Sequence, residues 1–208
     1  MAAVTPDTAT DPDAPEFAMP EPAMPDPDHV PVTGTLPDPD GDGETDDDRE
    51  LREWIVAEAE RRGNAVVAVP TDEHGAGYAF TVCAWAMHAV PEAVVVGLPE
   101  EQATVLLDAY VDRAATGERF EFGTLYHDFF EGVPVTFERV ATGHYPEFFG
   151  SAFLVYPEGD FPAVQILVPT PAGDWPWSPT APAGFARWQP VLTVSGAPEN
   201  WTPGVDGP

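Results

Sequence analysis

Residues 93–117 read AVVVGLPEEQATVLLDAYVDRAATG and contain the clearest local structure signals in the chain. The run from Ala93 to Leu98 is apolar without interruption, which predicts a strand that is buried on both faces. Pro99 and the two glutamates after it favour a helix start, apolar residues then recur at helical spacing, and Gly117 is a typical helix end. We therefore expect a buried strand that leads directly into a long helix.

Upstream of this unit, the sequence predicts another helix and two more strands. The triplet Asp46-Asp-Asp48 supplies a capping carboxylate and negative charge at the positive end of a helix dipole. Apolar residues follow at helical intervals, and Gly63 is the expected stop. Short apolar runs at 66–69 and 78–85, separated by turn residues, are typical of strands.

Downstream, residues 135–140 alternate with period two, which predicts a half-buried strand with Val135, Phe137 and Arg139 on one side. Segment 144–156 suits a helix apart from Gly150. Most connections are too short for a parallel crossover, so we expect a single α+β domain with a mostly antiparallel sheet and two or three helices. The remaining strands are expected at 119–122, 124–126, 163–168 and 191–194.

Charge and proline content divide the chain into three parts. The chain has 36 acidic and 8 basic residues and a formal net charge of −28. Residues 1–46 are acidic, rich in proline and poor in apolar groups, which predicts a disordered tail. This tail is either a solvating bristle or an arm for a basic protein partner. We expect the α+β domain at 47–194 and a flexible C-terminal tail at 195–208.

The same composition argues against several classes of function. An acidic surface without a basic stripe repels nucleic acid and anionic membranes. A signal peptide pattern and an apolar run of about 20 residues are both lacking, so the expected location is the cytoplasm. The lone Cys83 excludes an internal disulfide. With His88 it could form a nucleophilic pair, but its apolar neighbours favour a buried structural thiol.

Two groups of side chains are candidates for function. A small enzyme of unknown reaction could use Arg119, His127, Asp128 and His144, although no catalytic spacing is recognisable. His127, Asp128 and Glu131, together with His144 and Glu147, could bind a metal, but abundant acidic residues make chance pairings common, and we expect no metal site. No cofactor is indicated.

The second group lies near the C-terminus and favours binding of a small molecule, or a regulatory or interaction role. In the segment Asp174-Trp-Pro-Trp177, a proline fixes the backbone between Trp175 and Trp177. Trp188, Gln165 and Gln189 could complete a site for a planar ligand, since indole rings stack and amides donate and accept hydrogen bonds. The alternative is that the tryptophans cover one end of the core.

Several motifs occur in the order typical of one family. They are Tyr78-Ala-Phe-Thr-Val82, Pro91-Glu-Ala-Val-Val-Val-Gly-Leu-Pro99, Gly117-Glu-Arg-Phe120 and the region of Gln165, Trp175-Pro-Trp177 and Gln189. This pattern, over about residues 50–192, resembles an uncharacterised bacterial family, domain of unknown function 4262. The family usually has Gly-Leu where this chain has Cys83-Ala84, and Trp-Pro-Asp where it has Val168-Pro169-Thr170. The resemblance implies no established activity.

Overall fold

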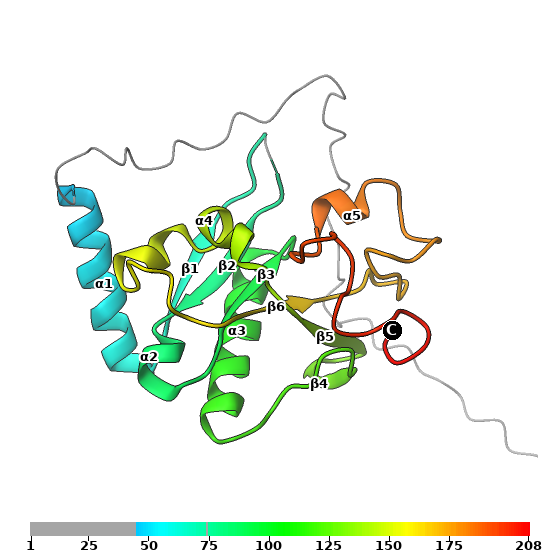
Figure 1. Cartoon of the computed structure of the whole chain (residues 1–208), viewed down its shortest axis with the longest axis horizontal. Helices are drawn as coiled ribbons and strands as arrows, with labels where there is room; N and C mark the ends of the chain where they lie inside the picture. The colour runs from blue at the N-terminus through cyan, green and yellow to red at the C-terminus, as the bar shows by residue number, and fades with distance from the viewer. Residues whose placement is uncertain (1–44, 74) are drawn as a thin grey trace, which may run out of the picture.

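The computed structural model describes residues 45–73 and 75–208 (Figure 1). Residues 1–44 lie outside the described residues. They include most of the tail expected at 1–46, so the predicted disorder of the tail and its binding to a basic partner stay predictions. Among the described residues, no helix is both long and apolar enough to cross a bilayer. The elements are α1 (Asp46–Arg62), β1 (Ala65–Val69), β2 (Tyr78–Val82), α2 (Ala84–His88), β3 (Glu92–Val96), α3 (Glu100–Ala115), β4 (Tyr126–Phe130), β5 (Val133–Arg139), η1 (Thr142–His144), α4 (Tyr145–Phe148), η2 (Gly150–Leu154), β6 (Ala163–Leu167) and α5 (Phe185–Trp188).

Within the described residues, the strands form one six-stranded sheet in the order β1-β2-β3-β6-β5-β4. Neighbouring strands are antiparallel, except that β3 and β6 are parallel. Their parallel pairing is possible because a long connection, which contains α3, β4, β5, η1, α4 and η2, lies between them in the chain. The prediction of an α+β fold with a mostly antiparallel sheet is confirmed.

Strand β3 divides the hydrophobic core into two layers. Ala93 and Val95 join the cluster that contains the buried face of α3, whereas Val94 and Val96 join a cluster with residues of α1, α4 and η2. Successive side chains of a strand point to opposite faces, so an unbroken apolar run serves both layers. The predicted burial of this strand on both faces is confirmed, and β3 lies in the middle of the molecule (Figure 1).

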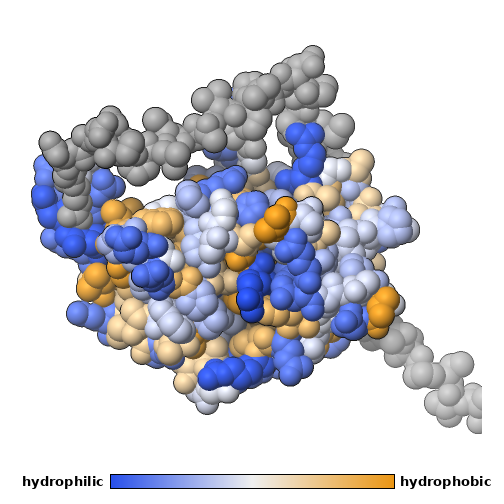
Figure 2. Space-filling model, in the orientation of Figure 1, coloured by the Kyte–Doolittle hydropathy of each residue, from blue (hydrophilic) through white to orange (hydrophobic). Residues whose placement is uncertain are grey.

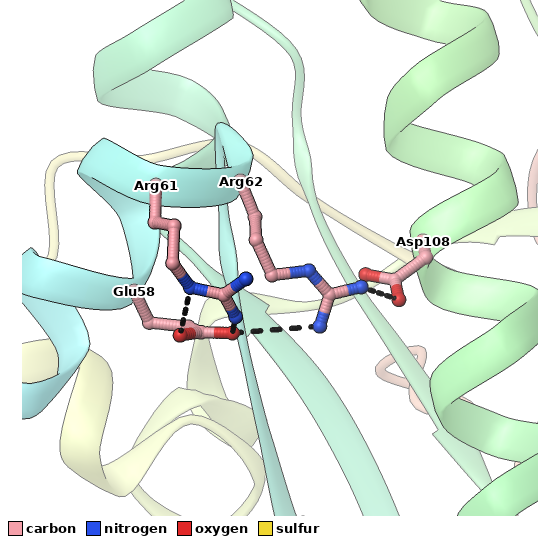
Figure 3. Close-up of polar contacts among 4 residues, drawn as sticks. All are labelled: Glu58, Arg61, Arg62 and Asp108. Carbon is pink, nitrogen blue, oxygen red and sulfur yellow. Dashed lines mark hydrogen bonds and ion pairs between the residues drawn. The ribbon is translucent and has the colours of Figure 1, made fainter.

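Helix α1 begins and ends where its sequence predicts. Thr45 accepts a hydrogen bond from the backbone N–H of Asp48, whose carboxylate accepts one in return from the backbone of Thr45. This capping box satisfies two backbone groups that the helix leaves unpaired. Gly63 ends the helix in the left-handed region, with φ of 93°. Arg62 then forms an ion pair with Asp108, which links α1 to α3 (Figure 3).

The C-terminal segment, residues 168–208, contains the short helix α5 and is otherwise irregular, and it covers β5 and β6 on the face opposite to α3. Residues 195–208, expected to form a flexible tail, contribute a buried Trp201. The fully buried carboxylate of Glu138 accepts hydrogen bonds from the backbone of Glu199 and from Asn200. Trp201 packs on Gly123, where an added Cβ would lie 2.7 Å from the indole.

Three predictions for this part of the fold are wrong. Strand β5 is buried on both faces from Val135 to Glu138 and is not half-buried, and of the three residues expected on one side, Val135 and Phe137 are buried and Arg139 is exposed. Residues 191–194 form no strand, because the backbone N–H of Leu192 bonds to a side chain of β6 and not to a neighbouring strand. Residues 119–125 are also irregular, and the strand begins only at Tyr126.

Strand β2 ends earlier than predicted because the chain turns at Cys83. This residue has φ of 74°, in the left-handed region, and the next five residues form α2. The predicted strand 78–85 is therefore wrong beyond Val82. A side chain in the left-handed region costs about 1–2 kcal/mol, which glycine avoids. The glycine usual in the family that this chain resembles would fit this backbone without strain.

We expect Cys83→Gly to be more stable than Cys83→Ala by roughly 0.5–1 kcal/mol. Both variants lack the sulfur, but only glycine relieves the backbone strain. The greater conformational entropy of glycine in the unfolded chain offsets part of this gain. Urea unfolding followed by circular dichroism measures the difference. The matched control is the pair wild type and Ala84→Gly, in which glycine at an ordinary helical residue should lower the free energy of unfolding. If the Cys83→Gly protein were less stable than the Cys83→Ala protein, the backbone at residue 83 would not be strained by a side chain.

Candidate functional site

The tryptophans of the Trp-Pro-Trp segment form a rigid stack with a third indole. The rings of Trp175 and Trp177 lie parallel, with centroids 5.4 Å apart and an interplanar angle of 5°. Trp201 contacts the ring of Trp177 edge-on, with the two ring centroids 5.0 Å apart. Trp175 is buried against Leu167, whereas the ring of Trp177 is partly exposed. Its indole N–H donates to the backbone oxygen of Pro208 at 2.9 Å, which fixes the ring further.

Trp188 contacts a different part of the protein. Its indole N–H donates to the backbone oxygen of Gly97 at 3.1 Å, in the turn after β3. Gly97 has φ of 84°, and an added Cβ would lie 2.8 Å from the indole ring. Only glycine fits both the backbone and the ring at this position. Trp188 is partly exposed, like Trp177, but it packs on the turn after β3 and not on the stack of Trp175, Trp177 and Trp201.

The two glutamines bind backbone of the protein itself. Gln165 in β6 donates to the carbonyl of Pro190 at 2.7 Å and accepts from the N–H of Leu192 at 2.8 Å. Gln189 accepts from the N–H of Val168 at 3.1 Å. Both side chains are fully or almost fully buried. Their contacts hold the irregular C-terminal segment on the sheet, so a ligand at the tryptophans would meet indole rings before it met these amides.

The polar residues considered for catalysis contact separate partners. Asp128 forms an ion pair with Arg113 at 2.9 Å, and this guanidinium lowers the pKa of Asp128. Arg119 donates to the backbone oxygen of Glu118 at 3.2 Å. His144 lies 3.0 Å from the backbone oxygen of Thr193. None of these contacts joins one candidate to another.

The sheet also separates these residues into two groups. Arg113, the partner of Asp128, stacks on Phe129 in the α3 layer, whereas His144 packs beside Phe148 in the α1 layer. His127 is exposed on β4. Over residues 45–73 and 75–208, no group of three or more His, Cys, Asp or Glu side chains could hold a metal ion, and Glu131 and Glu147 add no such group.

The polar centre that sequence reasoning missed is built around Glu92, at the start of β3. Its side chain is fully buried. One carboxylate oxygen accepts from the hydroxyl of Thr81 at 2.6 Å, and the other accepts from the hydroxyl of Tyr156 at 2.7 Å and from the N–H of Trp85 at 3.0 Å. Tyr156 also accepts from the N–H of Ala86 at 3.2 Å. The pair of Glu92 and Tyr156 therefore caps the first turn of α2.

Burial sets the acid–base properties of this centre. Loss of solvation raises the pKa of Glu92, while its hydrogen bonds act in the opposite direction without cancelling the effect. Burial, followed by the nearby carboxyl, also raises the pKa of Tyr156. Burial, followed by the charge of Glu92, raises the pKa of Cys83 to about 11, so its thiol stays protonated at neutral pH. The centre lies inside the fold, and its hydrogen bonds serve the turn between β2 and α2.

One signal in the sequence could have pointed to Glu92. It stands directly before four apolar residues of a strand that is buried on both faces, so its carboxyl had to be buried and partnered. The partner Tyr156 lies 64 residues away in the chain and could not be inferred.

The comparisons with known proteins agree with the resemblance found in the sequence. A family model described as Domain of unknown function (DUF4262) matches residues 58–182, which is more than half of the chain. The matched range includes Thr81, Glu92, Tyr156, Trp175 and Trp177. Neither the curated proteins nor the solved structures gave a match.

We expect the stability advantage of the wild type over Glu92→Gln to shrink as the pH rises above 4.5, the ordinary pKa of a glutamate, and through the raised pKa of the folded protein. Because the pKa of Glu92 is raised on folding, folding favours its protonated form, and this stability is lost as the pH rises through the folded pKa. The amide does not titrate. Chemical unfolding across this pH range gives both free energies of unfolding.

The control variant is Tyr156→Phe, which removes one hydroxyl donor but retains the carboxyl. It should be less stable than the wild type and should keep the dependence on pH. A difference between the wild type and Glu92→Gln that stays constant with pH would show that this carboxyl does not titrate differently on folding.

Proposed function

Because the chain belongs to the DUF4262 family, for which no activity is established, we propose a function from the geometry: a non-catalytic module that binds a small molecule or a regulatory partner through Trp177 and Trp188. The observation that carries the proposal is the partly exposed ring of Trp177, which is held by Trp175, Trp201 and the backbone of Pro208. A ring that is already fixed loses little entropy on binding.

The chemistry of this surface favours a planar or apolar ligand. Indole rings contribute large contact areas and stack on aromatic groups. Trp188 adds a second partly exposed ring, held by Gly97. The separate contacts of Arg119, Asp128 and His144 support binding over the alternative of a small enzyme, which would need its acid, base and substrate-binding groups to meet.

We expect Trp177→Ala to weaken ligand binding at least tenfold. A tenfold change in the dissociation constant corresponds to about 1.4 kcal/mol, and the loss of an indole contact that is buried in a complex costs more binding free energy than this. Native mass spectrometry of the freshly purified protein detects a retained small molecule, and a panel of aromatic heterocycles, followed by ligand-observed NMR, tests binding directly.

The matched control is Trp85→Ala, since Trp85 is 38% exposed but lies on α2, away from the stack. This variant should bind like the wild type. Equal binding by the Trp177→Ala and wild-type proteins, or no binding of any compound by either, would contradict the proposed site.

A further inference from the structure

Helix α1 contributes little to the core of its own chain. Of its 17 residues, only Ile55 and Ala59 are buried. Leu51 is 36% exposed, Trp54 is 48% exposed and Val56 is 42% exposed. A helix of this length is marginal in water, and its stability comes mainly from packing of an apolar face. The helix lies at the outer side of the molecule, beside the edge strand β1, and apolar groups interrupt the hydrophilic surface there (Figures 1 and 2).

The two end turns of α1 carry opposite charges, and charged residues of both signs lie between them. Asp46, Asp47 and Asp48 occupy the first turn, and Arg61 and Arg62 occupy the last. Trp54 is the middle residue of the helix. A second copy of the helix, laid antiparallel across the first at Trp54, would bring the acidic end of each against the basic end of the other.

The contacts of the basic end leave Arg61 in reach of a partner. Arg62 is held by Asp108 of α3, and the carboxylate of Glu58 lies between the two guanidinium groups (Figure 3). The side chain of Arg61 is nevertheless 66% exposed. The negative charge of Glu58 is compensated within its own chain, so it opposes a second copy less than a lone carboxylate would.

We propose that α1 is the interface of a homodimer, in which two copies of the helix pack antiparallel about a twofold axis at Trp54. Asp47 and Arg61 lie seven residues on either side of this axis. Asp47 of each copy therefore faces Arg61 of the other, and the exposed indoles meet at the centre.

Charge complementarity favours a second copy over other occupants. The acidic segment before the helix has no Lys or Arg, so it could match Arg61 but not the three aspartates. A basic partner would match the aspartates and not the arginines. A second, antiparallel copy of α1 matches both end turns, because it presents two arginines to the three aspartates and three aspartates to the two arginines.

The size of this interface predicts a concentration-dependent dimer. A helix of 17 residues is about 25 Å long. One pair of such helices lies at the small end of specific interfaces, for which we expect a dissociation constant in roughly the micromolar range. The net charge of −28 opposes approach at low ionic strength, so association is to be measured at about 0.15 M salt.

The test uses sedimentation velocity of the full chain from about 1 µM to about 1 mM. The wild type should dimerise. Asp47→Arg and Arg61→Glu should each weaken the dimer at least tenfold, because each places like charges together twice in a symmetric pair. An equal mixture of the two variants should recover association, since the arginine introduced in one variant then meets the glutamate introduced in the other.

The control is Glu101→Arg, which makes a similar charge change at an exposed position of α3 and should dimerise like the wild type. Circular dichroism verifies that every variant is folded. A wild type that stays monomeric to about 1 mM would mean that α1 is covered within its own chain or by another partner, and would overturn the proposal. Folded variants whose mixture does not associate would overturn the antiparallel arrangement.

Discussion

The buried carboxyl of Glu92 is the interaction on which the central part of the fold depends. It receives hydrogen bonds from β2, from the first turn of α2 and from Tyr156 after η2, and so joins segments that are far apart in the chain. Helix α2 has no capping side chain of its own, because it starts at a left-handed Cys83. A carboxyl from the neighbouring strand supplies the acceptor that the short helix lacks, at the cost of desolvating an acid.

The same solution recurs where β5 and β6 meet the C-terminal segment. An irregular segment cannot satisfy its own backbone groups when it is buried. Glu138 of β5 and Gln165 of β6 accept hydrogen bonds from the backbone of this segment, and Gln189 of the segment accepts one from the backbone of Val168. The sheet therefore carries polar side chains at positions where packing against a helix would have required apolar ones. The polar residues near the tryptophans are therefore explained first by the fold, and the exposed indole faces remain for function.

Local signals in the sequence predicted the elements that depend on local interactions. The strand at β3 and the helix α3 follow from an unbroken apolar run and from helical spacing between a proline and a glycine. The turn at Cys83, the burial of Glu138 and the pairing of Glu92 with Tyr156 depend on contacts between distant residues. No periodicity encodes such contacts, which is why the predicted strands at 78–85 and 191–194 were too long or absent. The candidate site was limited in the same way, since residue types named the tryptophans but could not say which rings would stack.

The two proposed surfaces lie near opposite edges of the sheet, on the same face, which is the face opposite to α3. Helix α1 borders β1 at one edge, whereas the tryptophan stack belongs to the segment that covers β5 and β6 (Figure 1). A dimer formed through α1 would therefore leave both tryptophan surfaces free and facing away from the twofold axis. Two sites on one rigid particle bind a divalent partner more tightly than either alone, because the second contact becomes intramolecular. Weak pairing of α1 would then make such binding depend on the concentration of the protein itself.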